Sequence, residues 1–149
     1  MIERICAVDP GGEHVGVAIF ARGADSNWRC QRAAEYTPAD FEDWFSQEIT
    51  YGEFRVVVVE EFRLYPDKAR AQTGSTMPTA ELIGVIKYVV RMFGGDTKLV
   101  LQPAAIKVPT RSLLREHGIK SVAKKLKAGG HAADAELHGW CYLLRATPG

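Results

Sequence analysis

The sequence predicts an α/β protein in which helices flank a mixed five-stranded sheet with the strand order 3-2-1-4-5. Two β-rich runs stand close together near the start of the chain, and only turn-forming residues separate them, as in an antiparallel hairpin. A later run is continuously β-branched, which is typical of a central parallel strand that is covered on both faces. Helical periodicity lies between the later strands, so we expect helical crossovers to add them to the sheet.

The length and composition indicate one domain over residues 1–149. The 46% of apolar and 25% of charged residues are ordinary globular values. There is no apolar run of about 18 residues and residues 1–4 do not have the shape of a signal peptide, so we expect no membrane partner. The three cysteines are widely spaced, which favours free thiols in a reducing compartment and a cytoplasmic location.

The first strand is expected over residues 5–8, and it ends on the carboxylate of Asp9. Pro10-Gly11-Gly12 breaks this strand, because proline lacks an N–H and glycine tolerates positive φ. The second strand follows over residues 15–20. Asp-Pro-Gly also occurs in plain turns, but a carboxylate at the end of an apolar strand is costly unless it is paired, hydrogen-bonded or bound to a cation.

A third strand, at an edge of the sheet, is expected over residues 28–36. A helix then begins after Thr37, because threonine can cap a helix and proline fits its first position. The apolar residues of this helix recur at helical spacing; they are Phe41, Trp44, Phe45 and Ile49.

The fourth strand is expected over residues 54–59 and ends in the pair Glu60-Glu61. Adjacent side chains of a strand point to opposite faces, so only one of these carboxylates can face Asp9. Val56 and Val58 share the face of Glu60, and Val57 and Val59 share that of Glu61. Alternatively, both glutamates mark the exit of the strand into solvent. A fourth strand placed beside the first brings Glu60 near Asp9.

Residues 63–78 have neither helical nor strand periodicity, and a loop of this length inside a compact domain is usually functional or mobile. A strong helix follows over residues 79–93, and Gly94-Gly95 closes it. This helix is apolar on most of its circumference, so we expect it to pack on the sheet and on a second subunit. Its main stripe consists of Leu82, Ile86, Val89, Val90 and Phe93, and Ile83, Val85 and Met92 extend the apolar surface beyond it.

The fifth strand is expected over residues 98–101, and short helical pieces follow over 103–127, with turns near Val108-Pro109 and His117-Gly118. The last helix is expected over residues 131–145. His131, Asp134 and His138 share a polar stripe of this helix, because they are spaced at i, i+3 and i+7. If the helix docks across the first and fourth strands, Asp134 joins the two acids there.

The net charge of +1 conceals an uneven distribution along the chain. Residues 35–61 hold eight acids and one base, whereas residues 98–130 hold eight bases and one acid. The basic segment is either a solvated helical face or a footprint for phosphates.

Three motifs stand out: Asp9-Pro-Gly-Gly-Glu-His-Val-Gly16, Val-Val-Val-Glu60-Glu, and His131-Ala-Ala-Asp134-Ala. Together they resemble the RuvC family of Holliday junction resolvases, within the ribonuclease H-like superfamily. The resemblance covers nearly the whole chain in length, motif order and element order. It implies a ribonuclease H-like fold and a crossover junction endodeoxyribonuclease of DNA recombination and repair, with four-way junctions as substrate and forks and flaps as further candidates. The compact size and the long loop after Phe62 look most like a phage-type member.

By position, the resemblance implies that Asp9, Glu60 and Asp134 are catalytic metal ligands, with His131 where the family places a further acid or a histidine. Such carboxylates suit Mg²⁺, with Mn²⁺ as a substitute, and two ions about 3.5–4 Å apart would clamp the attacking and leaving oxygens of a phosphodiester. His131 would bind metal or move a proton, unless it is a helix-start residue that faces solvent. Glu61 and His138 are candidates for residues that contact the metal ligands and orient them without binding the metal themselves.

The resemblance also implies a homodimer, formed through the helix of residues 79–93, that cuts opposed strands. The predicted DNA-binding residues are Phe62, Arg63, Tyr65, Lys68, Arg70, Lys107, Arg111, Arg115, Lys120, Lys124, Lys125 and Lys127. Among these, Phe62 and Tyr65 are the candidates for stacking on an unpaired base. Two alternatives are an RNA-processing nuclease of the same fold, similar to YqgF, and a non-catalytic junction-binding module. An actin-like ATPase would share the opening hairpin but needs a far longer chain.

Overall fold

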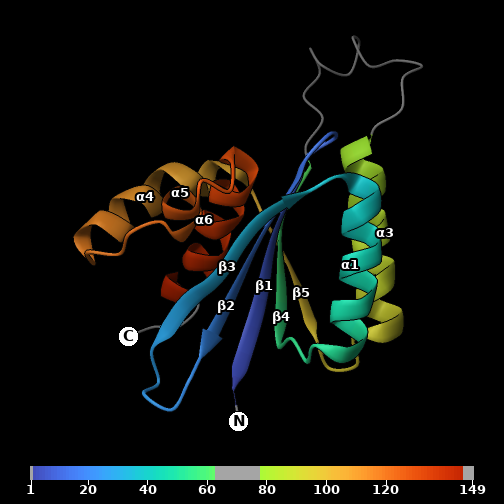
Figure 1. Ribbon diagram of the computed structural model, residues 1–149, viewed down its shortest axis with the longest axis horizontal. Coiled ribbons are helices and arrows are strands. Elements are labelled where there is room, and N and C mark those ends of the chain that lie inside the picture. Colours follow the sequence, from blue (N-terminus) through green and yellow to red (C-terminus); the bar gives the residue numbers. More distant parts are fainter. Residues whose placement is uncertain (1, 63–77, 146–149) are drawn as a thin grey trace.

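The computed structural model describes residues 2–62 and 78–145 (Figure 1). The strands are β1 (Glu3–Pro10), β2 (Val15–Arg22), β3 (Trp28–Tyr36), β4 (Val56–Glu60) and β5 (Lys98–Gln102), and the helices are α1 (Pro38–Tyr51), α3 (Pro78–Phe93), the short 3-10 helix η1 (Ala104–Ile106), α4 (Lys107–Glu116), α5 (Val122–Leu126) and α6 (Gly130–Arg145). The sheet order is β3-β2-β1-β4-β5, so the predicted order is confirmed.

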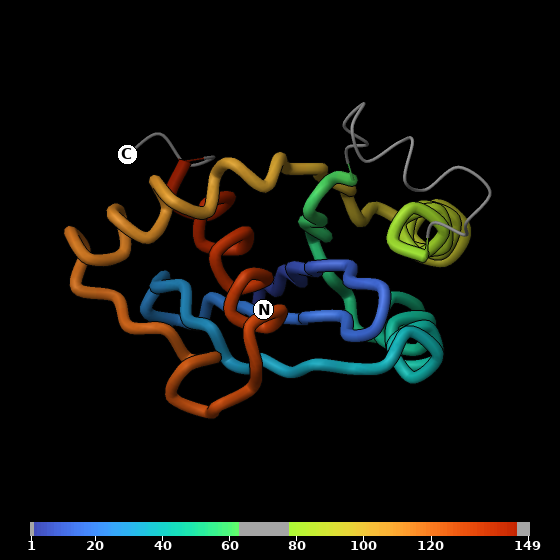
Figure 2. Tube along the Cα trace, turned by 90° about the horizontal axis from the view of Figure 1, so that it is seen from above, coloured from blue at the N-terminus to red at the C-terminus, as the bar shows by residue number. Residues whose placement is uncertain are grey.

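The sheet lies between two helical layers. Figure 1 shows α1 and α3 on one face and α4, α5 and α6 on the other, and the view along the sheet in Figure 2 shows the same separation. β1 is central, antiparallel to β2 and parallel to β4, and β4 is parallel to β5. The parallel pairing brings the ends of β1 and β4, and hence their terminal carboxylates, to the same edge of the sheet.

Alternation along β1 and β4 decides which helical layer these carboxylates face. Val8 is paired with Val59, and both pack with α1 and α3. Ala7 and Val58 are also paired, but they belong to the cluster on the α6 side. Because side chains alternate, the residues after Val8 and Val59 point toward α6. The predicted assignment of Val58 to the face of Glu60 is therefore confirmed.

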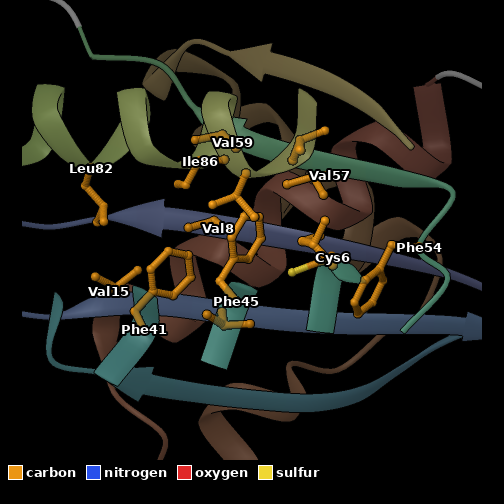
Figure 3. Packing of buried hydrophobic residues seen from close by; sticks show 14 of the residues in the cluster. Cys6, Val8, Val15, Phe41, Phe45, Phe54, Val57, Val59, Leu82 and Ile86 are labelled. Carbon is orange, nitrogen blue, oxygen red and sulfur yellow. The ribbon is translucent and has the colours of Figure 1, made fainter. Parts of the chain in front are cut away.

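Aromatic and branched side chains fill the core between the sheet and the helices α1 and α3, as Figure 3 shows. Phe41 and Phe45 of α1 stack with their ring centroids 5.0 Å apart, and Leu82 and Ile86 of α3 are buried beside them. Burying one such side chain is worth about 1.5–3 kcal/mol. The predicted start of α1 is also confirmed, since the Thr37 side chain accepts a hydrogen bond from the backbone N–H of Asp40.

Helix α6 lies very close to the hairpin strand β2, and glycine allows this contact. A Cβ on Gly16 would overlap with the backbone carbonyl of His131, and one on Gly139 would overlap with the ring of Phe20. Gly16, the last residue of the first motif, is thus required for the N-terminal end of α6 to reach the end of β1.

Several details of the prediction were wrong. Val108-Pro109 is not a turn but lies in the first turn of α4, where a missing N–H breaks no helical hydrogen bond. Ile83 is core, with 7% of its surface exposed, whereas Phe93, assigned to the buried stripe, is 51% exposed. Cys6, Cys30 and Cys141 are free thiols as predicted, although Cys30 is only half-buried. Among the described residues, no helix combines the length and apolar character that crossing a bilayer requires.

Candidate active site

Four side chains far apart in the sequence meet at the ends of β1 and β4 and the start of α6. The Nδ1 atom of His131 lies 3.1 Å from Oδ2 of Asp9, and Asp9 is hydrogen-bonded to Glu60. Asp134 joins them through Lys107, whose Nζ lies 3.3 Å from Oε1 of Glu60 and 3.2 Å from Oδ2 of Asp134. The structure thus brings Asp9, Glu60, His131 and Asp134 together in one continuous set of contacts.

The start of α6 is fixed by Glu35 of β3, which the sequence analysis did not single out. Its Oε1 accepts a hydrogen bond of 2.9 Å from the backbone N–H of His131, a donor that has no partner within the helix. Gly129, just before the helix, adopts a φ of +113°, and a Cβ there would overlap with the Glu35 carboxylate. Glu35 therefore sets the position of the first turn of α6, which carries His131 and Asp134.

His131 faces the carboxylates rather than only solvent. Its side chain is 44% exposed, and its ring lies next to Gly11, where a Cβ would be 3.0 Å from the ring atom Cε1. The first glycine of the Pro10-Gly11-Gly12 turn thus leaves room for the imidazole. The ring is placed to bind a cation together with Asp9 or to exchange a proton with it.

The pKa values of Asp9 and Glu60 are shifted in opposite directions. Burial and the neighbouring Glu60 raise the pKa of Asp9, His131 opposes this rise, and the result is a pKa of about 7. Burial would also raise the pKa of Glu60, but hydrogen bonds from His138 and Asp9 and the charge of Lys107 together lower it to about 2. Two carboxylates this close cannot both ionise cheaply without additional positive charge.

Lys107 supplies positive charge inside the carboxylate cluster. The sequence analysis placed this residue on the DNA-binding surface, but its side chain is only 22% exposed and lies between Glu60 and Asp134. Burial by itself would lower the pKa of Lys107, and the charges of these two carboxylates raise it above its ordinary value. Nothing in the local sequence indicates this position, because Lys107 is one of many bases in its segment.

His138 lies behind Glu60 and is completely buried. Its Nδ1 is 2.8 Å from Oε1 of Gln102, the residue paired with Glu60 on the neighbouring strand, and its Nε2 is 3.4 Å from Oε2 of Glu60. Nε2 has no hydrogen-bond partner of good geometry among the described residues. The arrangement orients the Glu60 carboxylate. Glu61 lies on the other face of the strand end, and its backbone N–H donates to the carbonyl of Gln102.

The donor chemistry of this cluster fits a hard divalent cation. Asp9, Glu60 and Asp134 offer carboxylate oxygens, which Mg²⁺ prefers, and His131 adds an imidazole nitrogen. The ammonium group of Lys107 lies between Glu60 and Asp134 and supplies the positive charge that a bound cation would supply there. Within residues 2–62 and 78–145, however, no three such side chains already surround one point. An ion bound by both Glu60 and Asp134 would take the position that the Lys107 ammonium group occupies between them.

The remaining predicted DNA-binding residues fall into three groups. The first lines a cavity between α4, α5 and α6 and consists of Arg111, Arg115, Lys120, Lys124 and Lys125. Lys127, at the exposed end of α5, is near them in sequence. Phe62 is partly buried against the core beside α1 and α3, so its ring is not fully free to stack. The third group, Arg63, Tyr65, Lys68 and Arg70, lies outside the described residues.

A second residue that the sequence analysis missed is Glu136 of α6, whose buried side chain contacts the start of α5. Its carboxylate accepts hydrogen bonds from the hydroxyl of Ser121 and from the backbone N–H groups of Val122 and Ala123, at 2.8, 3.0 and 2.9 Å. Trp140 Nε1 also donates to it, at 3.3 Å. Glu136 thus attaches the start of α5 to α6. A charged residue between the apolar positions of a buried helix was the available signal.

Comparison with known proteins gives structural matches only. The sequence matches no family model and no curated protein sequence. A Thermus thermophilus RuvC structure matches with a TM-score of 0.63 and 16% identity, over 98% of this chain and 95% of that one. The fowlpox virus resolvase in complex with Holliday junction DNA matches with a TM-score of 0.65 and 17% identity, over 98% of this chain and 99% of that one.

The yeast mitochondrial Holliday junction resolvase Ydc2 also matches, with a TM-score of 0.64 and 11% identity, over 95% of this chain and 78% of that one. Each match spans nearly the whole sheet and both helical layers of the present chain. At these identities the likeness establishes the fold and leaves the activity to be argued from the site. The chain therefore has the fold seen in these Holliday junction resolvase structures.

Proposed function

We propose that this protein is a Mg²⁺-dependent endonuclease that hydrolyses phosphodiester bonds in four-way DNA junctions. The observation that carries the proposal is the convergence of Asp9, Glu60, Asp134 and His131 at one edge of the sheet. The fold supports it, because two of the similar structures are complexes of resolvases with Holliday junction DNA. Forks and flaps are further candidate substrates.

Asp9, Glu60, Asp134 and His131 would hold Mg²⁺, which supplies positive charge to the attacking and leaving oxygens of the phosphodiester. A cation held by Glu60 and Asp134 would replace the ammonium group of Lys107 between them, and that group could then contact a non-bridging phosphate oxygen. His138 keeps the Glu60 carboxylate in one orientation while this exchange takes place. If His131 does not bind the cation, its imidazole next to Asp9 would instead exchange a proton during the reaction.

We also propose that the protein works as a homodimer through α3. Ile83, which the sequence analysis placed at the interface, is buried in the core and does not contribute. Tyr88, Met92 and Phe93 leave 51%, 54% and 51% of their surfaces exposed on this helix. An apolar helix face without a covering element within the described chain suits a two-fold contact, in which the same patch is used twice.

The proposed activity is tested with labelled four-way DNA, forked DNA, linear duplex and a structured RNA of matched length, each with Mg²⁺ and with EDTA. We expect cleavage of the four-way junction with Mg²⁺ only, and we expect Asp9→Asn and Asp134→Asn to abolish it while binding stays within a few-fold. Preferred cleavage of the RNA would favour the RNA-processing alternative. Junction binding without any cleavage would favour a non-catalytic module.

A further inference from the structure

The cavity between α4, α5 and α6 adjoins the carboxylate cluster. Its volume is about 940 Å³, and Asp134 and Arg111 line the side toward the cluster. The NH2 atom of Arg111 is 3.9 Å from Oδ1 of Asp134. A DNA strand whose phosphate lies at Asp134 therefore has this cavity next to it.

The inner wall of the cavity is aliphatic. Leu114 and Leu137 are each only 7% exposed, and Ile119 and Val122 are half-buried beside them. None of the described residues that line it is aromatic. Such a wall accepts the flat apolar face of a nucleobase but offers no ring to stack on it.

The rim of the cavity is basic. It carries the five exposed side chains of Arg111, Arg115, Lys120, Lys124 and Lys125. The two acids of the lining are already engaged, since Asp134 pairs with Lys107 and Glu136 accepts the hydrogen bonds that start α5. The free charge of the rim is thus positive and complements phosphates on both sides of a base.

We propose that this cavity seats one unstacked nucleotide of the DNA strand, adjacent to the bond that is cut. The inference rests on the proposed nuclease function and goes beyond it by assigning a nucleotide subsite. The volume lies within the usual range for ligand pockets of about 300–1,000 Å³. Extruding a base costs less where stacking is already interrupted, as it is at a branch point, so the subsite would favour branched over linear DNA.

Val122→Phe fills the cavity while keeping the backbone N–H that donates to Glu136. The matched control is Leu126→Phe, on the same short helix but outside the cavity and 56% exposed. In single-turnover cleavage of a four-way junction, we expect Val122→Phe to lose about tenfold or more and Leu126→Phe to behave as wild type. Thermal unfolding of both variants verifies that the fold is kept.

The second measurement reports on the base itself. Junctions carry 2-aminopurine at each position near the branch point, and the Asp9→Asn background keeps the strand intact. We expect emission to rise at one position next to the cut site, because the base leaves its stacked neighbours for an aliphatic wall, and Val122→Phe to abolish the rise. Removing this base to leave an abasic site should make wild type and Val122→Phe cleave at equal rates.

The outcomes separate the two proposals. If wild type cuts junctions but no position shows a rise that depends on Val122, the nucleotide subsite is overturned and the nuclease function stands. Equal rates of wild type and Val122→Phe on the intact junction would also overturn it and leave the rim as a phosphate contact only. If wild type neither binds nor cuts branched DNA, the proposed function fails, and the subsite fails with it.

Discussion

The raised pKa of Asp9 gives the stability of the metal-free protein a particular pH dependence. The folded-state pKa of Asp9, about 7, lies above the value of about 3.9 expected in the unfolded chain. Between these values the folded state binds more protons, so the free energy of unfolding should fall as the pH rises from about 4 to about 7. The depressed pKa of Glu60 acts in the opposite direction, but only below about pH 4.5.

We therefore expect Asp9→Asn to unfold with a flatter pH dependence than wild type between pH 5 and pH 7 in EDTA, and to be the more stable of the two at pH 7. Urea unfolding across this range measures it. Asp43→Asn, at an exposed position of α1, is the control and should keep the wild-type slope. Parallel slopes for wild type and Asp9→Asn would show that Asp9 is ionised in the metal-free fold.

The side chains of Glu60 and Glu61 point to opposite faces of the sheet, so we expect their substitution to have different effects on cleavage. Glu60 lies on the α6 face with Asp9, Lys107 and His138, whereas Glu61 follows on the other face. Glu60→Gln removes a ligand charge with little change of shape, so we expect Mg²⁺-dependent cleavage to be lost and junction binding to stay within a few-fold. Glu61→Gln should keep substantial activity when single-turnover cleavage of a four-way junction is measured for both variants. The reverse pattern would show that the active site lies on the face of Glu61.

Among the elements, α5 depends most on a single distant side chain. It has five residues, too few for independent helical stability, and the carboxylate of Glu136 accepts hydrogen bonds from Ser121, Val122 and Ala123 at its start. We expect Glu136→Gln to lower the free energy of unfolding by about 1–3 kcal/mol, because one or more buried donors lose their partner. Denaturant unfolding tests this, and an unchanged midpoint would contradict it. Glu116→Gln, exposed at the end of α4, is the control.

The exposed apolar face of α3 carries the dimer proposal. A charge in the centre of a two-fold interface is buried twice, so we expect Tyr88→Glu/Met92→Glu to be monomeric at micromolar concentrations at which wild type sediments as a dimer. Lys87→Glu, also exposed on α3 but outside the apolar face, tests whether charge alone is responsible. A wild-type protein that sediments as a monomer would exclude this interface.

At the scale of the whole molecule, the sequence predicted those features that depend on local periodicity and strand order. The order of strands and helices along the chain predicted the sheet order, which the structure confirms, and the resemblance of the motifs selected Glu60 as the partner of Asp9. The position of Lys107 could not be predicted in this way, because its partners are 47 and 27 residues away. The cap from Glu35 to His131 spans 96 residues, and no local pattern encodes such a contact.

The local sequence also does not determine which apolar residues of a helix become part of the core. A helix that is apolar on most of its circumference, as α3 is, gives a hydrophobic stripe without a unique direction. Which of its apolar residues become core depends on how the sheet and α1 pack against it. That is why Ile83 and Phe93 were assigned to the wrong environments, although the helix itself was predicted within one residue.

The sheet also separates the charges that are mixed in the total of +1. The acid-rich residues 35–61 include α1 on one face, and the base-rich residues 98–130 include α4 and α5 on the other, as the views in Figures 1 and 2 show. We therefore expect DNA to approach the face of α4, α5 and α6, and binding without metal to weaken steeply with salt. Each lost phosphate contact should reduce the slope of log affinity against log salt by about one unit.

Lys124→Ala/Lys125→Ala should accordingly bind junctions more weakly and with a salt slope smaller by about two units, because both side chains are exposed on the rim of the cavity. Lys87→Ala, on α3 at the opposite face of the sheet, should leave the slope unchanged. Fluorescence anisotropy of a labelled junction in EDTA, repeated at several salt concentrations, measures both. If the salt slope decreases for Lys87→Ala and not for the double variant, DNA binds on the face of α1 and α3. The basic segment and the face of the sheet that carries Glu60 would then not be the DNA-binding surface.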